Sequence, residues 1–196
     1  MLIVPALFDE ANRMRKLTVD VMRRLDAAGI DCFLPDLPGT NESLEPLDQQ
    51  TPQSWRNAMA AAARHFDASH VLTIRGGALV APETINGWRY APAKGATILR
   101  QMIRARILAQ RENGLEEKQD ALMESALSDG IELSGYRLGA DFVREFQSLL
   151  PVPSDAQQDV GQDMVGGSGL WLRAEPDESR EQADALAAIV SVGIRF

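Results

Sequence analysis

The amino-acid sequence predicts an α/β domain with a doubly wound, mostly parallel sheet of about six strands and a helical insertion. Its short apolar runs lack polar alternation, which is typical of strands that are buried on both faces. Amphipathic helical segments follow several of these runs, so strands and helices alternate along much of the chain. The 196 residues, 45% hydrophobic and 24% charged, supply one well-buried core. We therefore expect a single domain over residues 1–196.

The first part of the chain predicts successive strand-helix units. "LIVPAL" is the first strand, and residues 12–28 form a helix whose apolar stripe ends at Gly29. "DCFLPDL" is the second predicted strand, and the alanine-rich residues 53–66 are the next helix. They lead into "HVLTI", the third strand, and into "GWRYAP", a fourth strand that Pro92 cuts short. Crossovers of this kind are right-handed and give parallel neighbours.

Residues 93–137 interrupt the alternation and are predicted to be a helical insertion. Residues 97–111 and 116–127 have helical periodicity and are separated by an Asn-Gly turn. Three basic residues of the first insertion helix share a face: Arg100, Arg104 and Arg111. This face is either simply solvated or a docking surface for an acidic partner or an anionic polymer.

The C-terminal part predicts one more strand-helix-strand unit after a loop. A helix over residues 140–149 precedes "PVPSDAQQDVGQDMVGGSG", which has too few apolar residues for a core and is expected to be a mobile surface loop. "LWLRAEP", a helix over residues 179–189 and "SVGIRF" then complete the predicted sheet.

Composition limits the functional classes. The net charge of -8 argues against nucleic-acid binding, because phosphate contacts require a basic face. The single cysteine, Cys32, lies in an apolar segment and is expected to be buried in a reducing compartment. The N-terminus lacks a basic leader, and no apolar run approaches the ~20 residues of a membrane helix, so we expect a cytoplasmic protein without membrane insertion. Because metal-ligand spacings and nucleotide-binding glycine motifs are absent from the sequence, no cofactor and no metal are predicted.

Several stretches resemble a known family in order and spacing. "VPALFDEANRMRK", "FLPDLPGTNES" and "YAPAKGATILRQMIRARI", followed by "ELSGYRL", resemble the exosortase A-associated hydrolases of the α/β-hydrolase superfamily over roughly residues 3–140. Ala91 replaces the glutamine of the family's Gln-Pro turn. The resemblance implies a hydrolase-like sheet of six strands in the order 2-1-3-4-5-6, a lid at residues 93–137, and a setting in exopolysaccharide and sorted surface-protein systems of Gram-negative bacteria.

The nucleophile elbow of such hydrolases, Gly-x-Ser-x-Gly, corresponds to residues 73–77 and carries Arg75 at its centre. A guanidinium stays protonated and is not a nucleophile. The catalytic histidine of this fold follows the last strand, where the sequence offers none, and His65 and His70 are expected at the opposite end of the sheet. These departures from the family pattern therefore predict a pseudoenzyme that acts by binding.

The candidate binding residues surround the elbow. The sequence collects them after the predicted first, second and third strands: Asp9, Glu10, Asn12, Asp36, Arg75, Gly76 and Gly77. In one account Arg75 forms a structural ion pair with Asp9 or Glu10. In the other, Arg75 and the amides of the two glycines bind a small anionic ligand through its carboxylate or phosphate.

Two alternatives belong to other functional classes. The chain is an active hydrolase of an ester or thioester if Asp9, Glu10 or Asp36 serves as acid or base and Arg75 clamps the substrate. It is a structural or interaction protein if the insertion binds a protein partner, or if the edge of the second strand forms a homodimer.

Overall fold

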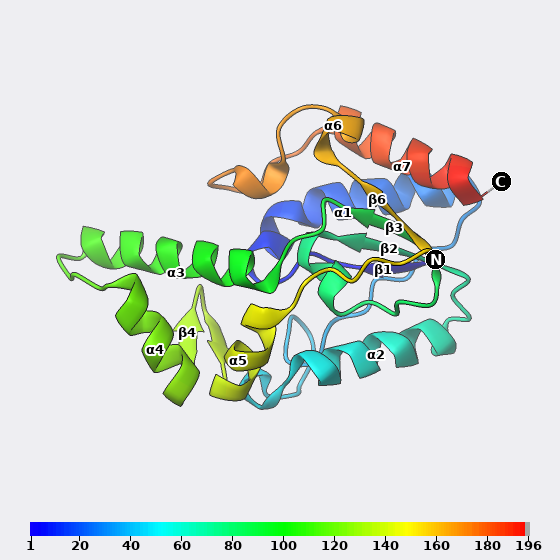
Figure 1. Cartoon of the computed structure of the whole chain (residues 1–196). Helices are drawn as coiled ribbons and strands as arrows, with labels where there is room; N and C mark the ends of the chain where they lie inside the picture. The colour runs from blue at the N-terminus through cyan, green and yellow to red at the C-terminus, as the bar shows by residue number, and fades with distance from the viewer. Residues whose placement is uncertain (195–196) are drawn as a thin grey trace.

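The computed structural model describes residues 1–194 and has an α/β fold built on a four-stranded parallel sheet (Figure 1). The strand order is β1-β2-β3-β6, and every neighbouring pair is parallel. The bounds of these strands are β1 Leu2–Val4, β2 His70–Ile74, β3 Asn86–Tyr90 and β6 Gln157–Val160. A mostly parallel sheet with helices is thus confirmed.

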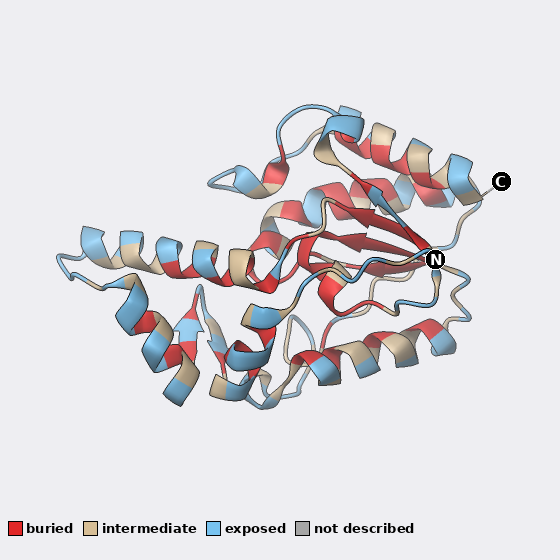
Figure 2. Ribbon diagram, in the orientation of Figure 1, coloured by how far each residue is buried: buried red, intermediate tan, exposed pale blue. Residues whose placement is uncertain are grey.

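Helices cover both faces of the sheet, which explains why its strands are apolar without alternation (Figure 2). On one face, helices α1 (Asp9–Ala27) and α7 (Arg180–Ile194) pack over Ile3, Leu72 and Ile74. On the other, helix α2 (Pro52–His65) packs over Leu2 and Val71. Side chains of a strand alternate between faces, so both sets are buried.

The insertion after β3 forms a helical arm that extends from the sheet (Figure 1). It contains α3 (Gly95–Glu112), α4 (Gln119–Asp129) and an antiparallel hairpin of β4 (Ile131–Leu133) and β5 (Tyr136–Leu138). Helix α5 (Ala140–Ser148) follows the hairpin. Its aromatic side chains Phe142 and Phe146 pack against Phe8 at the end of the sheet, and so attach the arm to the body.

The expected second strand is not formed. Residue Phe33 makes only an isolated parallel bridge to Leu2, through backbone hydrogen bonds of 2.8 Å to the amide of Ile3 and 2.9 Å to the carbonyl of Met1. Pro35 follows two residues later and has no amide hydrogen for a ladder. The segment therefore lies beside β1 without extending the sheet as a full strand.

The C-terminal part also differs from the prediction. "LWL" forms a short 3-10 helix, η3 (Leu170–Leu172), instead of a strand. Helix α7 continues to Ile194 through "SVGI", because Leu186 and Val190 keep a helical apolar stripe against α1. The last two residues of the predicted final strand, 195–196, lie outside the described residues.

The segment expected to be a mobile loop contains β6 and the short helix α6 (Gln162–Val165). The strand's sequence "QQDV" is polar, yet side-chain contacts hold it in place. The side-chain amide of Gln157 donates to the backbone carbonyls of Pro82 (2.7 Å) and Ile85 (3.1 Å), and the Asp159 carboxylate pairs with Arg89 at 2.6 Å. The six-strand order 2-1-3-4-5-6 is therefore not confirmed.

Among residues 1–194, no helix combines the length and apolar character that crossing a bilayer requires.

Candidate functional site

Arg75 follows β2 directly and adopts a left-handed backbone conformation with φ of 53°. It opens the 3-10 helix η2 (Arg75–Leu79). A non-glycine residue in this region costs on the order of 1 kcal/mol and is often found at functional sites. The turn packs tightly on β1, since a Cβ on Gly77 would lie 2.5 Å from the carbonyl oxygens of Val4 and Pro5. A sharp turn at the carboxyl end of a central strand therefore presents Arg75.

The guanidinium of Arg75 is held by a buried carboxylate. Its Nε lies 3.2 Å from Oε2 of Glu10 and its Nη2 lies 3.1 Å from Oε1, so the pair is bidentate. Only 9% of the Arg75 side chain and 2% of the Glu10 side chain are exposed. Nη1 donates to the carbonyl of Ala91 at 2.9 Å. These three contacts engage all three guanidinium nitrogens.

An aromatic ring covers the same guanidinium. The Cζ atom of Arg75 lies 4.1 Å from the centroid of a Trp171 ring, within cation-π range. Arg13 on α1 donates to the Trp171 carbonyl at 2.6 Å, and the indole meets Tyr90 edge to face. Burial raises the pKa of Tyr90 to about 12, and its hydroxyl donates a hydrogen bond to Oε1 of Gln162. Arg75 is thus enclosed by α1, β3 and η3.

The other acidic candidates have separate partners. Asp9 pairs with Arg13 one helical turn later. Asp36 accepts hydrogen bonds from the Asn41 side chain at 2.8 Å and from the Glu42 amide at 3.3 Å, so it organises its own loop. The structure therefore brings Arg75 and Glu10 together, and it gives Asp36 a local role.

Asn12 and Gly76 complete the candidate set. Asn12 is exposed on α1, and within residues 1–194 it makes no hydrogen bond to the Arg75–Glu10 pair. Gly76 is buried, and a Cβ there would come within 2.6 Å of Cδ1 of Ile98 on α3. Gly76 and Gly77 therefore let the turn approach its neighbours closely, and this packing accounts for both glycines.

Neither histidine lies near Arg75. His70 begins β2 and stacks on Trp88 at 5.9 Å between ring centroids, whereas Arg75 follows the last residue of the same strand. Five residues of strand separate the two by about 16 Å. His65 ends α2 against Phe66. Both histidines therefore lie at the amino ends of the strands, as the sequence predicts.

The thiol and potential metal ligands have no clustered arrangement among the described residues. Cys32 is half-buried, which corrects the expectation of full burial, because its strand does not form. Burial raises the pKa of its thiol. Within residues 1–194, no three His, Cys, Asp or Glu side chains gather in a way that could hold a metal ion.

The insertion uses part of its basic charge internally. Arg106 binds Glu117 through two hydrogen bonds of 2.9 and 2.6 Å, and these bonds lower the pKa of Glu117. Arg100 donates to the carbonyl of Ala96 within α3. The face carrying Arg100, Arg104 and Arg111 remains directed to solvent.

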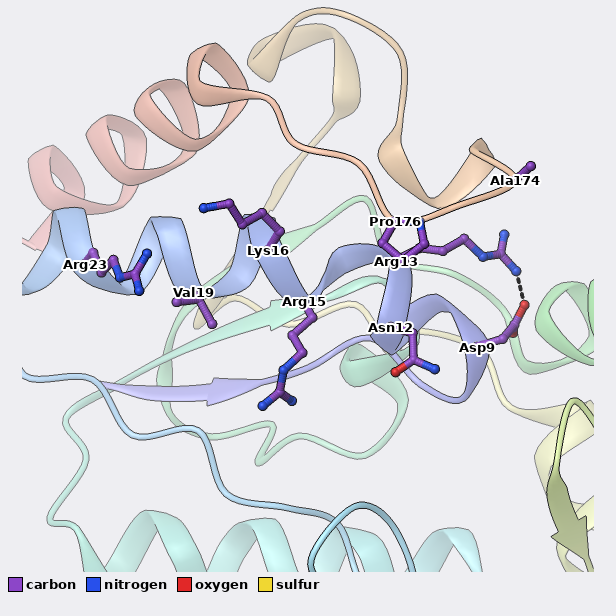
Figure 3. Close-up of a pocket in the computed structure, with 9 residues that line it drawn as sticks. All are labelled: Asp9, Asn12, Arg13, Arg15, Lys16, Val19, Arg23, Ala174 and Pro176. Atoms are coloured by element: carbon purple, nitrogen blue, oxygen red, sulfur yellow. Dashed lines mark hydrogen bonds and ion pairs between the residues drawn. The ribbon is translucent and has the colours of Figure 1, made fainter.

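A groove on the outer side of α1 was not predicted from the sequence (Figure 3). It has a volume of about 840 Å³. Four cations line it, with one acidic, one amide and three apolar side chains: Arg13, Arg15, Lys16, Arg23, Asp9, Asn12, Val19, Ala174 and Pro176. The sequence contains the basic residues of this groove in the run "NRMRK" and in Arg23 two helical turns later. It does not show that residues 174–176 lie beside them and form the other wall of the groove.

Comparison with protein-family models, with curated proteins and with solved structures gives no significant match to this chain.

Proposed function

We propose that this chain is a hydrolase-like binding protein that keeps the architecture of a nucleophile elbow without triad catalysis. The observation that carries the proposal is the bidentate Arg75–Glu10 pair at the end of β2. Ester hydrolysis in a hydrolase fold requires a hydroxyl or thiol at this position and a histidine base beside it. Arg75 supplies neither group, and both histidines lie at the other end of the strands.

The environment of Arg75 supports a structural role for its charge. A ligand anion would have to displace Glu10, and separating a buried ion pair costs several kcal/mol because each charge loses its partner. The stacked Trp171 ring covers the guanidinium as well. The alternative in which Arg75 clamps a substrate would require both contacts to open.

The arrangement of elements supports the likeness to α/β-hydrolases as part of the proposal. A parallel sheet is covered by helices on both faces, a positive-φ residue directly follows a central strand, and a helical insertion follows the next strand. The likeness to exosortase-associated hydrolases rests on the motifs of residues 3–140.

The test is an esterase assay with matched variants. Purified protein is incubated with short-chain nitrophenyl esters and acyl thioesters, next to Arg75→Ala and a control variant, Arg137→Ala, whose side chain is 73% exposed on the insertion. We expect all three proteins to match the rate in buffer. Turnover by the wild type and by Arg137→Ala that disappears in Arg75→Ala would overturn the proposal.

A further inference from the structure

The groove on α1 is chemically distinct from the enclosed Arg75 site. Four of its nine lining residues are cations, on a protein with a net charge of -8. The one acidic lining residue, Asp9, is already paired with Arg13. Arg15 has neither an ion-pair nor a hydrogen-bond partner within residues 1–194, and Arg23, 69% exposed, makes only a 3.3 Å contact with Asp20. The groove therefore has positive charge available for an external ligand.

The spacing of the groove residues matches an extended peptide. Figure 3 shows Arg15, Val19 and Arg23 in a row along α1. Residues four apart on a helix are separated by about 6 Å along its axis, so this row spans about 12 Å. Alternate side chains of an extended chain are about 6.6 Å apart and point to the same side. Carboxylates at the first and fifth peptide positions would thus meet Arg15 and Arg23, with an apolar side chain over Val19.

The chain itself already brings an acidic segment to this helix. Residues 174–178, "AEPDE", run beside α1, with Ala174 and Pro176 forming a wall of the groove. Glu178 of this segment reaches Nζ of Lys16 at 3.6 Å. An acidic, non-helical stretch of polypeptide is thus compatible with the shape and charge of α1.

We propose that this groove binds an extended acidic segment of a partner protein with the pattern acidic-x-apolar-x-acidic. The inference deepens the proposed function, because it names what a non-catalytic binding protein of this kind recognises. Arg15 and Arg23 contact the two carboxylates, and Val19 contacts the apolar side chain between them. Exposed charges such as those of Arg15 and Arg23 speed the association with an oppositely charged peptide and fix its position along the groove. Because dissolved salt screens these charges, binding should weaken as the salt concentration rises.

Fluorescence anisotropy with a defined peptide tests the proposal. The probe is fluorescein-labelled Gly-Glu-Ser-Leu-Ser-Glu-Gly, and the control peptides carry Gln for both Glu residues or place the Glu residues next to each other. We expect saturable binding of the probe that falls with added sodium chloride and is lost for both controls. The double variant Arg15→Gln/Arg23→Gln should weaken it about tenfold or more, since two charge-assisted contacts disappear.

A matched double variant away from the groove, Arg137→Gln/Arg144→Gln, removes the same net charge from another exposed surface. It should bind the probe like the wild type. If both double variants lose the same amount of peptide affinity, the binding depends only on the overall charge of the protein and the proposal is overturned. Absence of peptide binding to the wild type would also overturn it. Citrate or an aromatic sulfonate that binds the groove while the peptide does not would identify a small-anion site and also overturn it.

The outcome is separable from that of the esterase test. If the protein hydrolyses esters and also binds the peptide, only the proposed lack of catalysis is refuted. If it neither hydrolyses esters nor binds the peptide, only the proposed peptide site in the groove is refuted. All side chains changed in the two double variants are exposed, so unchanged circular dichroism melting serves as the folding control.

Discussion

Removing Glu10 should destabilise the protein far more than removing a surface partner. In Glu10→Ala the guanidinium of Arg75 stays buried but loses two of its three hydrogen bonds. Breaking one side of a buried ion pair costs about 3–5 kcal/mol. The Ala91 carbonyl and the Trp171 ring still stabilise the charge, so we expect the lower end, about 3 kcal/mol. For a chain of this size the loss corresponds to about 6–12 °C in Tm.

Urea unfolding monitored by tryptophan fluorescence measures this loss. The control is Glu132→Ala, which removes a partner from the exposed pair with Arg137 at 3.7 Å and should cost less than about 1 kcal/mol. The double variant Glu10→Ala/Arg75→Met should be more stable than Glu10→Ala alone, because no unpaired charge remains. If Glu10→Ala costs no more than Glu132→Ala, the pair is not the buried interaction described above and the reasoning fails.

Three further predictions concern the turn at Arg75 and its surroundings. Arg75→Ser places a hydroxyl at the turn after β2 but should show no esterase activity above buffer, because His65 and His70 both lie at the other end of the strands. Nitrophenyl ester turnover is the measurement. Gly77→Ala should lower the free energy of unfolding by about 1–3 kcal/mol, since its Cβ would lie 2.5 Å from two backbone oxygens; an unchanged urea midpoint would contradict the packing argument. The raised pKa of Tyr90 means that the unfolded chain loses this proton first, so the Tyr90 contribution to stability is complete below pH 10 and declines between pH 10 and about 12. Ultraviolet titration of the two tyrosines should therefore show a late transition that is absent from Tyr90→Phe.

Trp171 connects the buried pair to the surface groove. Its ring stacks on Arg75, and its carbonyl accepts a hydrogen bond from Arg13, which also lines the groove. The segment between η3 and α7 therefore starts beside Arg75 and ends at the exposed contact between Lys16 and Glu178. These contacts place Ala174 and Pro176 beside α1, where they line the groove.

Local sequence patterns were sufficient for most of the long helices and for the central strands. The helix predicted over 53–66 forms at Pro52–His65, where Thr51 and Ser54 make a reciprocal capping box and Pro52 occupies the first turn. Apolar runs at β1 and β2, and the segment "GWRYAP" at β3, identified strands buried between two helical layers. These features depend on neighbours in sequence, or on burial that any compact arrangement would provide.

The edge strands of the sheet could not be predicted from local sequence patterns. Strand β6 is polar, and its place depends on bonds from Gln157 to carbonyls some seventy residues earlier in the chain. The apolar segment around Phe33 makes only one bridge. At an edge, pairing with one neighbour and side-chain contacts replace burial on both faces, so apolar content no longer identifies a strand.

For the site, the sequence by itself determined that an arginine follows the third predicted strand and that two carboxylates follow the first. Only the tertiary structure decided between the carboxylates. Helix α1 begins at Asp9, and consecutive helical side chains diverge by about 100°, so Glu10 points inward to Arg75 while Asp9 faces Arg13. The groove likewise exists only because residues 174–178, far along the chain, fold back beside the cations of α1.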